Sequence, residues 1–174
     1  DFKNSTNLLD KWMMSELNML IKGVDENMEK YELSKAVRLF PKFIDNLSNW
    51  YIRRSRKRFW KSENDDDKNQ AYQTLYIVLV ELSKLMAPFI PFIAEEIYKN
   101  LTGNESVHLK HFPKADESLI DEKLNEEMRE VRIIISLGLQ LRADKKIKVR
   151  QPLNELRIVN YELREEFQNI VREE

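Results

Sequence analysis

The spacing of the apolar residues is the feature that most constrains the fold of this chain. From residue 8 to residue 31 they recur every three or four positions: Leu8, Leu9, Trp12, Met13, Leu17, Leu20, Ile21, Val24, Met28 and Tyr31. This spacing places side chains on one face of an α-helix. The 174 residues include only 3 glycines and 5 prolines, which favours helices over a loop-rich β fold.

Four further helices are predicted by the same spacing. They cover residues 33–60, 67–87, 92–101 and, after a capping-box spacing at Ser118 and Asp121, the stretch to about residue 143. Pro41 lies inside the first of these, so we expect a kink there, because proline removes a backbone hydrogen bond. Helices joined by short links predict an all-α fold, a bundle of about five antiparallel helices.

The pattern changes after Lys145. Residues 156–159 are β-like in composition, and residues 161–171 are expected to be helical. Because one strand cannot form a sheet, we interpret this short β/α piece as the truncated start of a following C-terminal subdomain. The predicted domains are therefore 1–144, the helical domain, and 145–174, an incomplete subdomain. Since the first residue is Asp1 and not Met, we expect a piece of a longer protein.

Several classes of function are excluded by residues that the chain lacks. The absence of cysteine excludes disulfides and thiol catalysis. No apolar run reaches the roughly 18 residues of a membrane span and no signal peptide leads the chain, so we expect no membrane partner. The three glycines lie too far apart for a phosphate loop, and His108 and His111 lack further ligands at metal-binding spacing. We therefore predict no catalytic residue and no metal site.

The net charge of −1 hides two basic islands. The first is RRSRKRFWK at residues 53–61, preceded by Trp50, and the second is RADKKIKVR at residues 142–150. Cations meet phosphates, and aromatic rings stack on unpaired bases, so both islands are candidates for binding nucleic acid. The alternative is structural, because cations at a helix C-terminus complement the helix dipole, and Trp50 and Trp60 are candidates for the core.

Four stretches, in order and with matching spacing, resemble the anticodon-binding domain of the isoleucyl-tRNA synthetase family. They are DNLSNWYIRRSRKRFW (45–60), LVELSKLMAPFIPFIAEEIYKNL (79–101), SVHLKHFP (106–113) and IKVRQPL (147–153). The resemblance covers about residues 10–159. The pattern APFxPFxxEExY is shared with the related valyl and leucyl class I synthetases, which remain alternatives, whereas the first and last stretches favour isoleucine.

The resemblance implies a parent isoleucine-tRNA ligase that uses ATP, with magnesium, in a catalytic domain. That domain's HIGH and KMSKS signatures are absent here, so we expect it upstream, with an inserted editing domain. The resemblance implies no active site or cofactor in this piece, a cytoplasmic location, and two kinds of partner: the tRNA(Ile) anticodon stem-loop and the catalytic and editing domains of the same chain. The residues expected to bind RNA are Trp50, Arg53, Arg54, Arg56, Lys57, Arg58, Trp60, Lys145, Lys146, Lys148 and Arg150.

A helical protein-interaction bundle is the remaining alternative. It is suggested by the near-neutral charge and by the acidic stretch 116–127, which would dock another protein. The two hypotheses differ in their salt dependence. If the five cations of residues 53–58 neutralise phosphates of a single strand, the logarithm of the binding constant should fall with a slope of about −3.5 against the logarithm of salt concentration.

Overall fold

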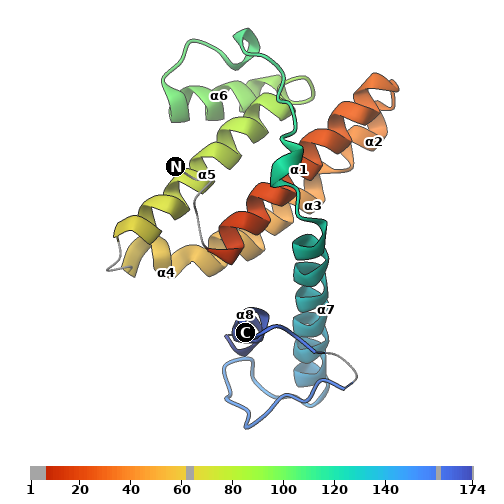
Figure 1. Cartoon of the computed structure of the whole chain (residues 1–174), viewed down its shortest axis with the longest axis vertical. Helices are drawn as coiled ribbons and strands as arrows, with labels where there is room; N and C mark the ends of the chain where they lie inside the picture. The colour runs from red at the N-terminus through yellow and green to blue at the C-terminus, as the bar shows by residue number, and fades with distance from the viewer. Residues whose placement is uncertain (1–6, 62–64, 160–161, 174) are drawn as a thin grey trace. The chain divides into compact units, whose positions relative to one another are not determined.

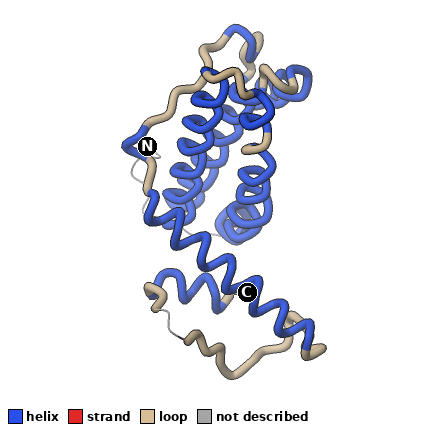
Figure 2. The backbone as a smooth tube through the Cα atoms, turned by 90° about the vertical axis from the view of Figure 1, so that its right-hand side faces the viewer, coloured by secondary structure: helices blue, strands red, loops and turns tan. Residues whose placement is uncertain are grey.

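The computed structural model describes residues 7–61, 65–159 and 162–173, and these residues form helices and loops but no strand (Figure 2). The elements are α1 (Leu8–Glu29), α2 (Leu33–Val37), α3 (Phe40–Asp45), the π-helix η2 (Asn46–Ile52), α4 (Arg53–Lys61), α5 (Asp65–Met86), α6 (Pro91–Thr102), the 3₁₀-helices η3 (Val107–Leu109) and η4 (Glu117–Leu119), α7 (Glu122–Asp144) and α8 (Glu165–Arg172). The all-α prediction is confirmed. The chain forms two compact units, Asp1–Asp121 and Glu122–Glu174. The predicted domain boundary between residues 144 and 145 stays a prediction.

Helix α1 is the centre of the first unit, where it packs against α2, α3, η2 and α5 (Figure 1). Its apolar stripe is buried as predicted, with Trp12, Met13 and Val24 fully inside. The stripe ends before its predicted last residue. Tyr31 follows the end of α1 in the left-handed conformation, with φ of 57°, and its side chain is 91% exposed.

The long helix predicted over residues 33–60 is divided into four segments. A turn separates α2 from α3, and Pro41 lies in the first turn of α3, where its missing N–H leaves no hydrogen bond unmade. The predicted kink is therefore a break, located just before the proline. The π-helix η2 then continues into α4, and its wider turns change which side chains face inward. Ala36, Phe40 and Leu47 are buried, but Leu33, Val37 and Ile44 are exposed.

Polar side chains on α1 hold the segment that leads to the second unit. The Ser15 hydroxyl accepts a hydrogen bond from the backbone N–H of Asp121 at 2.8 Å, although the two residues lie 106 positions apart. The amide oxygen of Asn18 accepts one from the N–H of Asp116 at 2.8 Å. Both side chains are buried, so each satisfies a backbone donor that would otherwise be costly to bury.

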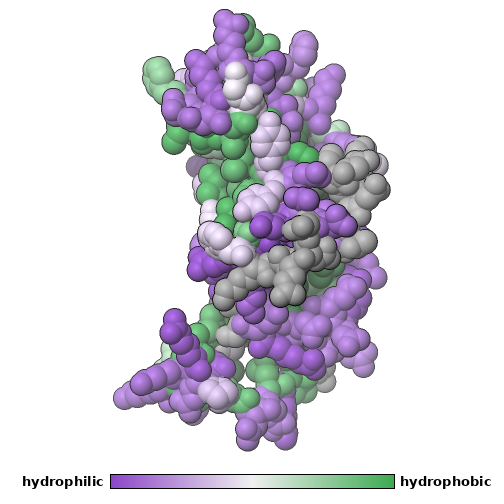
Figure 3. Space-filling view, turned by 90° about the vertical axis from the view of Figure 1, so that its left-hand side faces the viewer, coloured by the Kyte–Doolittle hydropathy of each residue, from purple (hydrophilic) through white to green (hydrophobic). Residues whose placement is uncertain are grey.

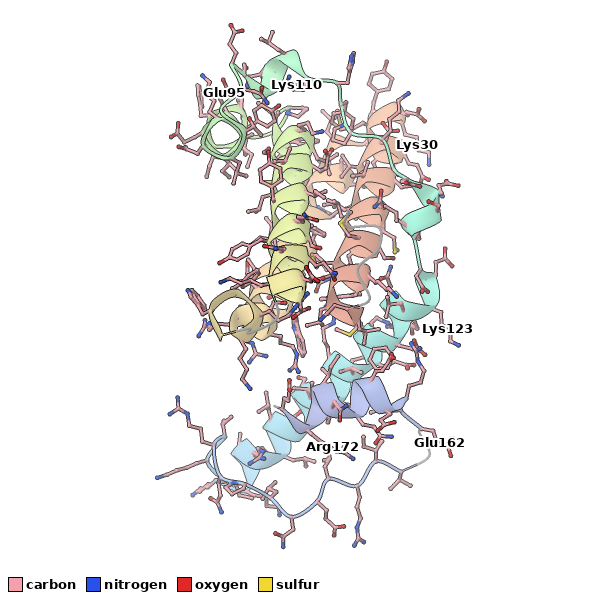
Figure 4. The ribbon with its side chains drawn as sticks, turned by 60° about the vertical axis from the view of Figure 1, so that its left-hand side comes forward. Lys30, Glu95, Lys110, Lys123, Glu162 and Arg172 are labelled. Carbon is pink, nitrogen blue, oxygen red and sulfur yellow. The ribbon has the colours of Figure 1, made fainter. Side chains whose placement is uncertain are left out.

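Helix α6 begins at Pro91 and ends at Thr102, and it is capped by Gly103, which has a φ of 67°. Its residue Glu95 fixes the loop that follows (Figure 4). The Glu95 carboxylate accepts hydrogen bonds from the backbone N–H of Val107 at 2.8 Å and from the Ser106 hydroxyl at 3.0 Å. The hydrogen bond from Lys99, and next the one from Val107, lower the pKa of Glu95. Val107 thereby packs in a small cluster with Tyr98.

The second unit consists of α7, α8 and the loop between them. Helix α7 buries Leu124, Met128, Val131 and Ile135, and α8 packs on α7 while burying Phe167 and Ile170. The predicted β-like piece at residues 156–159 is wrong, because these described residues form loop. A β-like composition forms a strand only where a partner strand pairs with it. Tyr161, where the predicted helix begins, lies outside the described residues. Across the described ranges, no helix combines the length and apolarity needed to cross a membrane.

A buried ion pair fixes the direction of α4 within the first unit. The Arg58 side chain is 12% exposed, and its guanidinium donates to both carboxylate oxygens of Asp10 on α1, at 2.7 and 2.8 Å. Its Nε donates to the carboxylate of Asp67 on α5, at 2.9 and 3.0 Å to the two oxygens. Paired, bidentate hydrogen bonds are the strong form of this interaction. They tie α4 to α1 and α5 at a single point.

Tyr51 of η2 completes this network. Its hydroxyl donates to Asp10 at 2.8 Å and lies 3.3 Å from the carbonyl oxygen of Ala71. Burial, followed by the negative charge and hydrogen bond of Asp10, raises the pKa of Tyr51 well above its ordinary value. Burial by itself lowers the pKa of Arg58, but the hydrogen bonds to Asp10 and Asp67 outweigh it and raise that pKa. The network is therefore stable with a neutral phenol and a charged guanidinium.

The substitution Asp10→Asn tests how much the network stabilises the fold. We expect the free energy of unfolding to fall by about 3 kcal/mol, because removing one charge of a buried pair leaves the other poorly compensated. Urea denaturation followed by circular dichroism measures this. The control is Glu32→Gln, which removes only an exposed ion pair with Lys35 and should leave the midpoint unchanged. Equal midpoints for Asp10→Asn and the wild-type chain would contradict this account.

Tyr51→Phe tests the pH dependence of the same network. At neutral pH we expect a loss of about 1 kcal/mol, the net value of one hydrogen bond. The folded chain retains the Tyr51 proton above pH about 10, where the unfolded chain releases it, so this contribution to stability is lost as the pH rises. The stability of wild-type protein should thus decline more steeply above pH about 10 than that of Tyr51→Phe. Parallel declines in urea titrations across that range would refute the assignment.

Candidate nucleic-acid interface

The first basic island begins where the π-helix passes into α4. Arg53 places its guanidinium 5.9 Å from the centre of the Trp50 ring, and its Nε donates to the carbonyl oxygen of Asn49 at 2.8 Å. A cation over an indole face is a stabilising contact. Trp50 is half-buried and Arg53 is exposed, so the pair lies at the surface with its geometry already set.

Arg56, Lys57 and Trp60 form the exposed face of α4. Trp60 is 72% exposed, and both cations are exposed as well. Residues three and four apart are neighbours on a helix surface, so both cations lie within one turn of the Trp60 indole. Among the residues that the structure describes, neither Arg56 nor Lys57 forms an ion pair. Their charges are therefore available to a ligand, unlike the charge of Arg58.

Arg54 and Arg58 have different surroundings from these exposed cations. Arg58 points into the bundle, where its Nε, Nη1 and Nη2 atoms each donate to Asp10 or Asp67. Arg54 is half-buried and also has interaction partners. The helix thus divides the five cations of residues 53–58 into an inner set and an outer set. This geometry supports Arg58 as a positioning residue that orients α4.

The second basic island lies in the second unit, after α7. Lys145, Lys146, Lys148 and Arg150 are all exposed. Lys146 has a φ of 55°, and the backbone N–H groups of Lys146 and Ile147 donate to the carbonyls of Ala143 and Arg142. This is the Schellman arrangement, which closes the end of a helix. Arg142 donates to the carbonyl oxygen of Gln151 at 2.8 Å, so the loop is held while its cations face solvent.

Sequence reasoning missed the acidic partners of the first island. Asp10 lies on the apolar face of α1, three and seven residues before the buried Met13 and Leu17. An acid in such a position predicts a buried cationic partner, because an unpaired charge there is too costly. That signal was present in the sequence. The identity of the partner, 48 residues away in the chain, was not.

The arrangement suits recognition of a polyanion by charge and stacking. Exposed cations can pair with phosphates, and an exposed indole beside them can stack on unstacked bases. His108 in η3 and His111 in the loop that follows are both exposed. Within the described part of the chain, no group of three or more histidine or acidic side chains is placed to hold a metal ion.

Comparison with known proteins agrees with this geometry. The family model for the anticodon-binding domain of tRNA ligase matches residues 10–158. The chain is 54% identical over 157 residues to the isoleucine–tRNA ligase of Dehalococcoides mccartyi strain CBDB1, covering 87% of this chain and 16% of that protein. It is 46% identical to the isoleucine–tRNA ligases of Clostridium novyi strain NT and Clostridium acetobutylicum, covering 98% and 100% of this chain.

The chain spans less than a fifth of the length of these relatives, 17% and 18% of the two clostridial proteins. The matched range includes the whole of the first unit from Asp10 onward, α7 and the second basic island. Both the Asp10–Arg58 network and the exposed face of α4 lie inside it. The chain therefore belongs to the anticodon-binding domain family of the tRNA ligases.

Proposed function

We propose that this domain binds the anticodon stem-loop of an isoleucine tRNA. The observation that carries the proposal is the exposed face of α4, where Arg56 and Lys57 lie within one turn of Trp60. An anticodon loop presents unpaired bases and closely spaced phosphates, which rings and cations bind respectively. Family membership supports the class of ligand, since the matching model describes anticodon binding.

The buried network gives this face its rigidity. Because Arg58 is held by Asp10 and Asp67, α4 is anchored to α1 and α5 within the same helical turn as the exposed cations. A rigid interface loses less conformational entropy on binding than a mobile one. Arg58 would have to leave two carboxylates to reach a phosphate. At most the four other cations of residues 53–58 then contact phosphates, so the salt slope has a magnitude of at most about 2.8, smaller than the value expected from five.

The second basic island is assigned an auxiliary role in the proposal. Lys145, Lys146, Lys148 and Arg150 project from a loop held by Arg142, and phosphate contacts by such cations would position the RNA without reading its sequence. They would add affinity that depends strongly on salt.

The choice of isoleucine is supported by the relatives, which are isoleucine–tRNA ligases. On this proposal the parent protein joins isoleucine to its tRNA in the cytoplasm, using ATP and magnesium in a catalytic domain outside residues 1–174. The catalytic and editing domains of the same polypeptide would be the other partners of this domain. Binding the anticodon here would position the acceptor end of the tRNA at that distant site.

The experiment is a titration with isoleucine tRNA and with the same tRNA carrying a changed anticodon, followed by tryptophan fluorescence at two salt concentrations. We expect tighter binding of the native anticodon, with a fluorescence change from Trp50 or Trp60. The double variant Arg56→Glu, Lys57→Glu should weaken binding and reduce the magnitude of the salt slope by about 1.4, because two phosphate contacts are lost.

The matched control is Lys30→Glu, Lys42→Glu, which changes the net charge equally at exposed positions outside α4. It should bind as the wild type does. If both double variants lose the same affinity, the effect is one of total charge, and the assignment of the α4 face is wrong. If the wild-type chain binds none of the RNAs at low salt, the proposed function itself fails.

A further inference from the structure

Helix α5 carries two exposed aromatic side chains beside α4. Tyr72 is 47% exposed and Tyr76 is 45% exposed. They lie one turn apart, so their Cα atoms are separated by about 6 Å along the helix axis. Helices α4 and α5 are packed together, and Figure 3 shows the face on which they lie, with pale side chains of intermediate hydropathy running over it.

Contacts with α4 hold the Tyr72 ring in place. The centres of the Tyr72 and Phe59 rings are 5.1 Å apart with the planes tilted by 51°, and the Tyr72 hydroxyl lies 3.4 Å from the Phe59 carbonyl oxygen. Phe59 is buried and is followed directly by the exposed Trp60. Tyr76 forms no hydrogen bond or ring contact within the described ranges. Tyr72 is therefore preorganised, while Tyr76 is accessible.

Each of the two helices places a cation one turn before an exposed ring. On α4, Arg56 precedes Trp60 by four residues, and on α5, Lys68 precedes Tyr72 by four. Residues with this spacing are neighbours on one helix face. Asp67 is the acid next to Lys68 in the sequence, and its carboxylate is neutralised by Arg58. The repeated unit of cation and ring is the composition of surfaces that bind single-stranded nucleic acid.

We infer that Tyr72 and Tyr76 extend the α4 face into a track on which successive unpaired bases of the anticodon loop stack, an inference that rests on the proposed RNA-binding function. The rings would take the bases, and Arg56, Lys57 and Lys68 would take the phosphates. The track gives α5 a base-binding surface, whereas the RNA-binding residues expected from the sequence include none on α5.

The kind of exposed side chain favours RNA over a protein as the occupant of this track. On the described parts of α4 and α5, every exposed large hydrophobic side chain is aromatic: Trp60, Tyr72 and Tyr76. By contrast, the exposed apolar residues of α7 are aliphatic: Ile133, Leu137 and Leu141. Aromatic faces beside cations bind bases by stacking, whereas an aliphatic face offers no ring on which a base can stack.

The test measures binding of the anticodon stem-loop of isoleucine tRNA, with 2-aminopurine replacing a loop base, by the 174-residue chain. The key variants are Tyr76→Ala and Tyr76→Phe, compared with Tyr31→Ala, which removes an even more exposed tyrosine beyond the end of α1, at 91% against 45% for Tyr76. Tyr76→Ala should weaken binding by about fivefold to 100-fold. Tyr76→Phe should bind as the wild type does, because the ring is retained. Tyr31→Ala should also bind as the wild type does, because it leaves the track intact.

Two further readouts separate stacking from other causes. Quenching of 2-aminopurine on binding should be reduced in Tyr76→Ala, since the base loses its stacking partner. The salt slope should be unchanged in that variant but should fall in magnitude by about 0.7 in Lys68→Ala, which loses a phosphate contact. Circular dichroism checks that all variants retain wild-type helicity, as expected because Tyr31 and Tyr76 are exposed and Lys68 is only half-buried.

The outcomes distinguish this inference from the proposed function on which it rests. If Tyr76→Ala binds with wild-type affinity and quenching while Arg56→Glu, Lys57→Glu is weakened, the RNA-binding function stands and the track is wrong. If the wild-type chain does not bind the stem-loop, both are wrong. If RNA binding is normal in Tyr76→Ala and a protein partner is lost, the face docks a protein and the inference is overturned.

Discussion

The bidentate clamp of Arg58 between Asp10 and Asp67 is the interaction on which the geometry of the first unit depends. A guanidinium with this degree of burial requires compensating carboxylates, and these come from α1 and α5. Because the three helices meet at one charged point, α4 cannot rotate without leaving a charge unpaired. The rotation of α4 in turn decides that Arg56 and Lys57 face solvent. The buried pair therefore gives the domain specificity of orientation, whatever its net effect on stability.

Helix α1 extends the same principle along its length. Its buried polar residues each satisfy a partner that is distant in the chain: Asp10 accepts from Tyr51 and Arg58, Ser15 from the N–H of Asp121, and Asn18 from the N–H of Asp116. Apolar contacts bring these segments together, but they are not directional. Hydrogen bonds to α1 select one arrangement among those that would bury similar areas. The polar positions on α1 thus determine the path of the chain, and the apolar positions determine its compactness.

Periodicity alone predicted α1, α5, α6 and α7 to within about two residues at most ends, because each is a continuous helix with one apolar face. It failed over residues 33–60, where a break before Pro41 and the π-helix η2 depend on tertiary contacts such as that of Asn46 with Glu16. It also failed at residues 156–159, where composition resembles a strand but no pairing partner is present in the described chain. For the candidate site, the sequence located the basic island but could not tell Arg58 from Arg56.

That distinction also explains how a chain with a net charge of −1 can present a surface for a polyanion. The acidic residues do not neutralise the basic ones uniformly, because Asp10 and Asp67 both pair with the inward-facing Arg58. The exposed cations Arg56 and Lys57 keep their local field within about a Debye length, roughly 8 Å at physiological salt. Total charge averages over distances much longer than that. The partner of such a surface therefore depends on the cations that remain exposed and not on those paired inside the fold. A count of all basic residues overestimates both the affinity for a polyanion and its salt dependence.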